Sequence, residues 1–214
     1  GNRELLDVMA ARPKLLGSPT ISPTHFEDSL RWLDMFDRND RLAHATLMID
    51  TIRERPGDEG YYKLFAEAAK RRVPIFLNGP SWDHVRLLSW PSGPAFAPFE
   101  GRSAAKEVLD MLVEVDRRHP ELPIIVGHGM GEDGVWLAQR TKNVYLELAG
   151  SYPELGAIRR TIDEVGKERV VFGSDLDFIA PAYALGVYAA ADMTPDEERA
   201  VMAENARGIL RLPG

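Results

Sequence analysis

Cysteine is absent from the 214-residue sequence, which excludes disulfide bonds, thiolate metal sites and cysteine nucleophiles. No apolar run approaches the roughly 18 residues that cross a bilayer, and no signal peptide is visible at the start. The formal net charge is −7, and no run of lysine and arginine alternates with aromatic residues. We therefore expect a cytoplasmic protein with no membrane partner and no nucleic-acid partner.

The overall composition is that of a globular protein. Hydrophobic residues make up 44% of the chain and charged residues 28%. A chain of this length and composition can bury one substantial core. We expect a single domain over residues 1–214, and the sequence shows no internal repeat or low-complexity tract.

Apolar runs typical of buried strands alternate with segments of helical periodicity along the whole chain. The expected strands are Leu15 to Ser22, Ala45 to Ile49, Val73 to Leu77, Pro123 to Gly127, Asn143 to Leu148 and Arg169 to Phe172. The expected helices are Asn2 to Ala11, a segment from Pro23 through Phe36, Tyr61 to Arg72, Ser103 to Arg118, Val135 to Gln139, Ile158 to Val165 and Thr194 to Leu210. This alternation predicts an α/β protein with a parallel sheet, either open and doubly wound or a β/α barrel. There are six such βα units rather than eight.

Polar residues follow four of the expected strands. Asp175 lies beyond the strand of RVVFGSDLDF, Asn78 follows VPIFL, His128 follows PIIVG, and Glu147 is near the end of NVYLEL. Because the carboxyl ends of parallel strands meet at one edge, these side chains are expected to converge. A histidine and an aspartate together suit either divalent-metal binding or proton transfer through water.

Each of these residues also has a simpler interpretation. Asp175 is equally compatible with capping a following helix or turn. His128, in GHGMG, is compatible with a turn between glycines, and Asn78 with a cap on the end of its strand. Glu147 fits a carboxylate that pairs with an arginine or is exposed at the rim of a barrel.

The segment from Gly79 to Gly101 is the longest without regular periodicity, and a loop this long in a compact domain is usually functional or mobile. Trp82 and His84 within it are candidates for lining a substrate site. A surface position for His84, and a buried patch or a dimer contact for the aromatic residues, are the alternatives.

Several motifs together resemble a known family. They are VPIFLN, RHPELPIIVGHGMG, LAQRTKNVYLELAGS, VGKERVVFGSDLDF and TPDEERAVMAENARGILRL. In these the chain resembles the amidohydrolase-related (amidohydrolase 2 type) family of TIM-barrel metal-dependent hydrolases. The branch that it resembles includes aminocarboxymuconate-semialdehyde decarboxylase-like and pyrone-dicarboxylate lactonase-like enzymes. The resemblance runs from about Asn2 to the C-terminus and implies a (β/α)8 fold.

The resemblance implies roles for particular residues. Asp175 matches the strand-8 aspartate that binds metal and handles the proton of the attacking water in relatives. His128 matches the strand-6 histidine that activates or orients water or substrate, and both residues are predicted metal ligands. The implied cofactor is a divalent metal, zinc in relatives. Asn78 stands where many relatives have a histidine ligand, and an amide oxygen is a far poorer zinc ligand.

A second departure from the family lies near the N-terminus, where relatives carry a His-x-His pair on strand 1. No such pair occurs in this sequence. Aligned to the family, Leu15 to Ser22 corresponds to strand 3, so strands 1 and 2 are missing and the predicted barrel is incomplete. An open barrel exposes two strand edges, which need pairing or covering. Either upstream residues have been removed or the protein is a shortened form, and we favour a shortened form that assembles as a homodimer.

The leading prediction is an amidohydrolase-like hydrolase or non-oxidative decarboxylase acting on a small carboxylated or cyclic substrate, with water activated by Asp175 and His128. A metal-free, lactonase-like hydrolase is the second prediction, since it tolerates the loss of the strand-5 histidine. A catalytically inactive binding or scaffold protein is the third. Predicted substrate-binding residues are Asn78, Trp82, His84 and Glu147.

Overall fold

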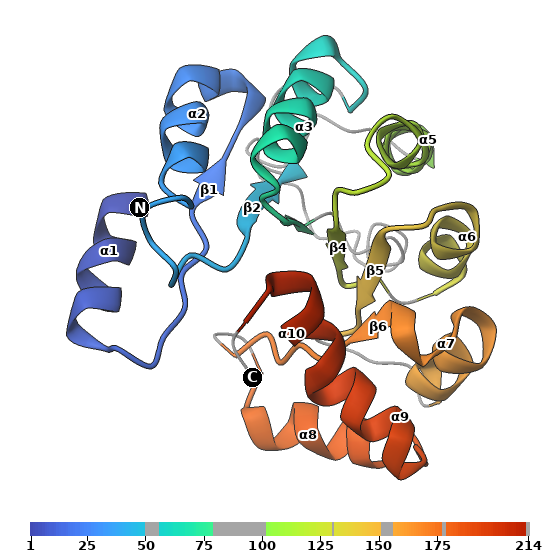
Figure 1. Ribbon diagram of the computed structural model, residues 1–214. Coiled ribbons are helices and arrows are strands. Elements are labelled where there is room, and N and C mark those ends of the chain that lie inside the picture. The colour runs from blue at the N-terminus through green and yellow to red at the C-terminus, as the bar shows by residue number, and fades with distance from the viewer. Residues whose placement is uncertain (50–55, 79–101, 130, 151–155, 177–178, 213–214) are drawn as a thin grey trace, which may run out of the picture.

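The computed structural model describes residues 1–49, 56–78, 102–129, 131–150, 156–176 and 179–212. Its six strands form one parallel sheet in the order β1-β2-β3-β4-β5-β6, so neighbours in sequence are neighbours in the sheet (Figure 1). The strands are β1 (Thr20–Ile21), β2 (Ala45–Met48), β3 (Ile75–Asn78), β4 (Ile124–Gly127), β5 (Val144–Glu147) and β6 (Val170–Val171). The predicted fold class, an incomplete (β/α)8 barrel, is confirmed.

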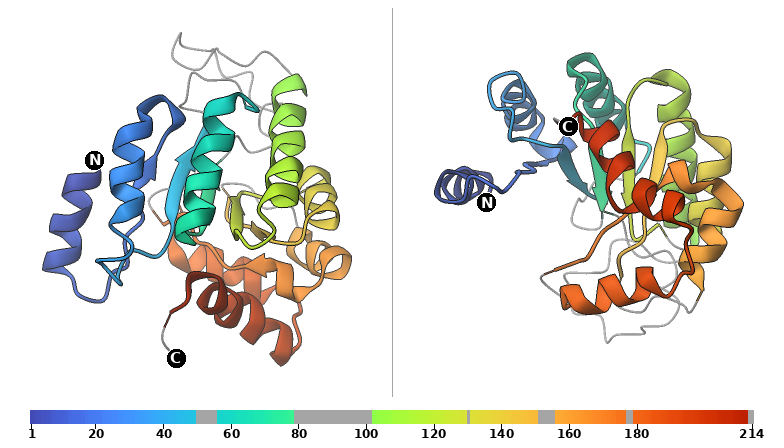
Figure 2. Two further views of the ribbon diagram at one scale, coloured as in Figure 1. Left: turned by 45° about the horizontal axis from the view of Figure 1, so that its top comes forward. Right: turned by 60° about the horizontal axis from the view of Figure 1, so that its bottom comes forward.

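A helix follows each strand, as right-handed βα units require. The helices up to β6 are α1 (Asn2–Ala11), α2 (Phe26–Asp34), α3 (Glu59–Arg71), α5 (Arg102–Arg118), α6 (Glu132–Arg140) and α7 (Ala157–Val165). After β6 come α8 (Pro181–Ala189), α9 (Pro195–Arg199), the π-helical turn η4 (Ala200–Glu204) and α10 (Asn205–Leu210). Helices α2, α3, α5, α6 and α7 lie around the outside of the curved row of strands (Figures 1 and 2).

The closing helix expected over Thr194 to Leu210 is present, as the continuous segment from α9 through η4 to α10. The sequence did not predict α8. This helix contains no charged residue, so it lacks the alternation of apolar and polar faces that marks a surface helix. In the described part of the chain, no helix is both long enough and apolar enough to span a bilayer.

The main hydrophobic core lies between the sheet and the outer helices. Strand residues such as Leu47 and Leu77 are buried there against Leu64 of α3 and Leu112 of α5. A smaller cluster lies on the inner side of the sheet, where Ile125 of β4 and Val171 of β6 contact Ile209 of α10. The C-terminal helix thus occupies part of the interior that opposing strands fill in a closed barrel.

Asparagine side chains cover both edges of the sheet. The side-chain amide of Asn2 donates to the carbonyl of Thr20 in β1 and accepts from its N–H, both at 2.8 Å. At the β6 edge, Asn205 donates to the Val170 carbonyl at 2.8 Å, and the Phe172 N–H donates to a carbonyl of η4 at 3.0 Å. The edges that the sequence analysis expected to need covering are therefore bonded to helices rather than to further strands.

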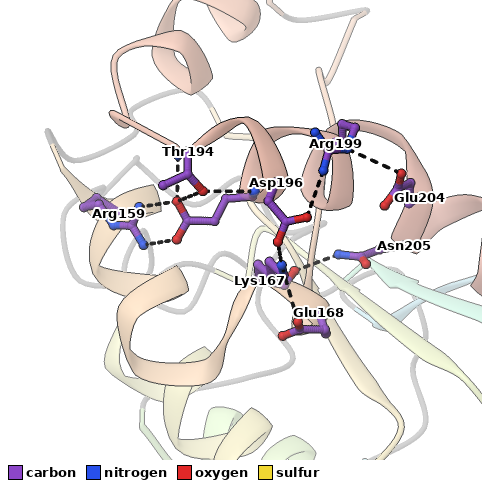
Figure 3. Close-up of polar contacts among 9 residues, drawn as sticks. Arg159, Lys167, Glu168, Thr194, Asp196, Arg199, Glu204 and Asn205 are labelled. Atoms are coloured by element: carbon purple, nitrogen blue, oxygen red, sulfur yellow. Dashed lines mark hydrogen bonds and ion pairs between the residues drawn. The ribbon is translucent and has the colours of Figure 1, made fainter.

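Polar contacts hold the C-terminal helices to the barrel (Figure 3). Asn205 donates a second bond from its amide, to the carbonyl of Lys167 at 2.7 Å. Arg159 of α7 donates two hydrogen bonds to Glu197 of α9, at 3.0 and 2.9 Å, and this arginine with Thr194 lowers the pKa of Glu197 to about 2. The asparagine of the ENARGIL motif therefore has a structural role, because it anchors α10 beside β6.

Candidate active site at the carboxyl ends of the strands

The structure places four of the predicted site residues at one edge of the sheet. Asn78 is the last residue of β3 and Glu147 is the last residue of β5, while His128 directly follows β4. Asp175 lies four residues beyond the end of β6. In the sheet, Asn78 pairs with Gly127, the neighbour of His128. The carboxyl edge of a parallel barrel is where this fold places its catalytic groups.

His128 has a left-handed backbone conformation, with φ of 56°, which is uncommon outside glycine. Its Nδ1 lies 2.7 Å from the carbonyl oxygen of Ala149. Because a carbonyl only accepts, Nδ1 must carry the proton in this contact. The neutral imidazole then has an unprotonated Nε2, which can take a proton or bind a metal.

Asp175 also has a left-handed backbone, with φ of 50°. Its side chain is half-buried, and in the described residues no hydrogen bond or ion pair engages its carboxylate. Strained backbone positions of this kind cluster at functional sites because the surrounding structure holds them there. A half-buried carboxylate at the same edge of the sheet as a histidine is suited to proton transfer.

Glu147 is buried, with 6% of its surface exposed. Its Oε2 accepts from the backbone N–H of His128 at 3.1 Å and its Oε1 from that of Ala149 at 2.7 Å. Burial raises the pKa of Glu147, the two N–H groups and the His128 charge oppose this rise, and the charge of Asp175 adds to it. The interpretation of Glu147 as an arginine-paired or rim-exposed carboxylate is therefore not what the structure shows.

Asn78 is half-buried, and its amide nitrogen lies 3.2 Å from the sulfur of Met48 on the neighbouring strand. The amide therefore faces the interior edge of the barrel beside the other site residues. Trp82 and His84, the two predicted residues of the long segment from Gly79 to Gly101, lie outside the described residues.

The sequence analysis missed two residues that shape this site. Tyr188 of α8 is 2% exposed, and its hydroxyl donates to the carbonyl of Val171 at 3.3 Å. Gly173 leaves room for Glu147, since a Cβ there would lie 1.5 Å from its Oε1. In the sequence, Gly173 could be recognised only as the glycine that ends the apolar run of the last strand. Tyr188 lies in α8, whose sequence shows no alternation of apolar and polar residues from which a helix could be predicted.

Between the ends of β5 and β6 and helix α8 lies a cavity of about 10 Å³, lined by residues that include Ala149, Gly173 and Tyr183. This space admits a single water molecule. Leu176, which is 62% exposed, follows Asp175 directly, and half of the Tyr183 surface is also exposed. The edge of the site around Asp175 is therefore apolar.

The predicted metal ligands do not by themselves make a metal site. His128 Nε2 and the Asp175 carboxylate are two donors, and the described residues contain no group of three or more His, Cys, Asp or Glu that could hold a metal ion. Protein metal sites of the zinc type use three or four such donors. Asn78 supplies an amide oxygen, which is a weaker ligand than an imidazole.

Comparisons with known proteins agree with the fold. A search of curated protein sequences gives no significant match. Among solved structures, 5-carboxyvanillate decarboxylase from Sphingomonas paucimobilis aligns with a TM-score of 0.76 at 17% identity, over 100% of this chain and 72% of its own. The 2,6-dihydroxybenzoate decarboxylase from Rhizobium gives 0.74 at 19% identity, over 100% and 76%. A dihydroxybenzoic acid decarboxylase from Polaromonas, with bound manganese and the inhibitor 2-nitroresorcinol, gives 0.74 at 17%, over 99% and 74%.

The sequence itself matches a family model. The model described as Amidohydrolase aligns with residues 2–212, almost the whole length of the sequence. This match covers all six strands and the residues His128 and Asp175. The chain therefore belongs to the amidohydrolase family.

Proposed function

We propose that the chain catalyses the non-oxidative decarboxylation of a small aromatic carboxylic acid, with His128 and Asp175 moving the proton. The observation that carries this proposal is the pair itself. In the neutral form of His128, Nε2 is the nitrogen without a proton because Nδ1 donates its hydrogen to the Ala149 carbonyl, and the Asp175 carboxylate has no partner in the described residues. Both lie at the carboxyl edge of the sheet, where a substrate would reach them.

Non-oxidative decarboxylation replaces the carboxylate on the ring carbon by a proton, so it requires a proton donor and no attacking nucleophile. Asp175 or Nε2 of His128 first takes up a proton from solvent and then delivers it to the ring carbon that carries the carboxylate. A carbon–hydrogen bond forms there, the bond to the carboxylate breaks, and carbon dioxide leaves. The electron pair of the broken bond returns to the ring. His128 and Asp175 are the described groups at this edge that can hold and deliver that proton.

The choice of an aromatic acid is supported by the surroundings and by the relatives. Leu176 and Tyr183 present apolar surface beside Asp175, which suits the face of a ring. The structural relatives named above act on dihydroxybenzoates and a carboxyvanillate. One of them contains manganese, so a divalent metal belongs in the assay, although the described residues supply only two donors for it.

A metal-free hydrolase of the lactonase type is the second candidate. Asn78 favours it, because an amide occupies a strand end where relatives place an imidazole ligand, and this amide is bonded to Met48. In that reaction His128 Nε2 would take the proton of an attacking water.

The test is release of carbon dioxide from a panel of hydroxybenzoates that includes 2,6-dihydroxybenzoate and 5-carboxyvanillate, with and without added Mn²⁺. A panel of lactones is assayed in parallel. We expect Asp175→Asn and His128→Asn each to lower decarboxylation by about 100-fold or more, the usual contribution of a general acid or base. Hydrolysis of a lactone without any decarboxylation would support the second candidate. A folded protein that turns over neither panel would contradict both and favour a binding protein.

A further inference from the structure

Glu147 is a buried carboxylate with an unusual set of partners. In the described residues it pairs with no lysine or arginine, and instead its two oxygens each accept one backbone N–H, from His128 and from Ala149. A buried carboxylate is costly unless its oxygens are hydrogen-bonded. These two bonds are therefore the reason that the carboxylate can lie here, and they tie it to the backbone of the histidine.

The two residues whose N–H groups bind Glu147, His128 and Ala149, also form the hydrogen bond that holds the imidazole. Ala149 donates its N–H to Glu147 and accepts the Nδ1 proton of His128 through its carbonyl, at 2.7 Å. His128 donates its N–H to Glu147 while its backbone is held at φ of 56°. The carboxylate thus fixes both ends of the contact that decides which ring nitrogen carries the proton.

The segment that follows β6 and carries Asp175 passes directly over this carboxylate. A Cβ at Gly173 would lie 1.5 Å from Oε1 and 2.3 Å from Cδ of Glu147, so any larger residue would displace the Glu147 carboxylate. Two residues further along the chain is Asp175. Glu147 is therefore packed between the two segments that supply the candidate catalytic residues.

We propose that Glu147 is a positioning residue that holds His128 as the Nδ1–H tautomer, with Nε2 directed to the substrate. Gly173 is the residue that makes this arrangement possible. The proposal builds on the proposed function, in which His128 Nε2 handles a proton, but its main readout is the state of the imidazole rather than turnover.

The test compares Glu147→Gln with Asp116→Asn. Asp116 is a matched control because it is also 6% exposed, and its carboxylate also accepts two backbone N–H groups, from Lys142 and Asn143. These groups lie at the start of β5, the end opposite to Glu147. Each variant replaces one acceptor oxygen by an NH₂ group that faces a backbone donor.

The tautomer of His128 is measured by long-range ¹H–¹⁵N NMR of the intact chain at a pH where the imidazole is neutral. We expect the wild type and Asp116→Asn to show the Nδ1–H form. We expect Glu147→Gln to increase the ratio of Nε2–H to Nδ1–H about tenfold or more, which corresponds to about 1.4 kcal/mol. A folded Glu147→Gln protein that keeps the wild-type ratio would overturn the proposal.

Gly173→Ala provides a second test, in case Glu147→Gln does not fold. The added methyl displaces the carboxylate without removing its charge, and the same shift in tautomer ratio is expected. An unchanged ratio in folded Gly173→Ala would equally overturn the proposal. With a substrate identified, Glu147→Gln should lower kcat more than it raises KM. A wild-type protein without turnover would reject the proposed function and leave the tautomer result standing.

Discussion

Replacing Gly134 by alanine tests how helix α6 is seated against the turn that carries His128. Alanine normally stabilises a helix relative to glycine by about 0.8–1.0 kcal/mol. Gly134 lies inside α6 and is buried. A Cβ added there would lie 2.0 Å from the carbonyl oxygen of Gly129, the residue after His128. The substitution therefore sets helix propensity against a backbone clash.

The clash is the larger effect. Ordinary contact begins at 3.4 Å, so α6 and the turn must separate by 3.4 − 2.0 = 1.4 Å. Neither group can rotate away, because the oxygen belongs to the backbone. Overpacking of this kind costs about 1–3 kcal/mol or more, and it exceeds the gain in propensity. A backbone clash this close lies at the upper end of that range, and subtracting the gain in propensity leaves about 2 kcal/mol. We therefore expect Gly134→Ala to lower the free energy of unfolding by about 2 kcal/mol, and Tm by roughly 4–8 °C for a chain of this size.

Gly208→Ala is the matched control. Gly208 lies inside α10 and is exposed, and apart from the backbone of its own helix no atom of the described residues lies within 4 Å of the position that a Cβ would take. Here propensity acts alone, so the variant should be more stable than wild type by about 0.5–1 kcal/mol. Urea unfolding followed by circular dichroism measures both variants. A Gly134→Ala protein as stable as Gly208→Ala would refute the close approach between α6 and the His128 turn.

Two further predictions concern stability. Asn205→Ala removes two hydrogen bonds to backbone carbonyls, at 2.7 and 2.8 Å, and uncovers part of a strand edge. Thermal unfolding should show that the free energy of unfolding falls by about 2–4 kcal/mol. The control Gln139→Ala, which removes an exposed amide, should change it by less than about 0.5 kcal/mol. Burial lowers the pKa of His44 to about 4 from 6.5. As the pH falls, His44 therefore takes up a proton in the unfolded chain before it does so in the folded chain. The contribution of neutral His44 to the free energy of unfolding is complete above pH 6.5, and about 3 kcal/mol of it is lost between pH 6.5 and 4. Urea unfolding across this range should show a flatter pH dependence in His44→Gln, and an unchanged slope would contradict the assignment.

The alternation of apolar runs and amphipathic segments determined most of the fold. Strands at Ala45 to Ile49 and Pro123 to Gly127, for example, were predicted within one or two residues of their observed bounds. Helix α8 could not be predicted in this way, because it is apolar on all sides and has no charged residue to mark its outer face. Predictions of zinc, a homodimer and a cytoplasmic location stay predictions.

The sequence also indicated where the site lies, because the ends of parallel strands must meet. It predicted that Asn78, His128, Glu147 and Asp175 lie at one edge, and the structure has them there. The role of Glu147 needed the tertiary structure. Nothing in NVYLEL shows that this carboxylate binds two backbone N–H groups rather than an arginine.

The sequence by itself therefore determined the order of strands and helices, the family, and the edge of the sheet that carries the polar residues. These follow from local periodicity and from motifs, which need no distant contact. The tertiary structure decided which His128 nitrogen is free, how Gly173 makes room for Glu147, and how Asn2 and Asn205 cover the strand edges. Each of these depends on atoms that are distant in sequence and meet only when the chain is folded, so no local pattern encodes them.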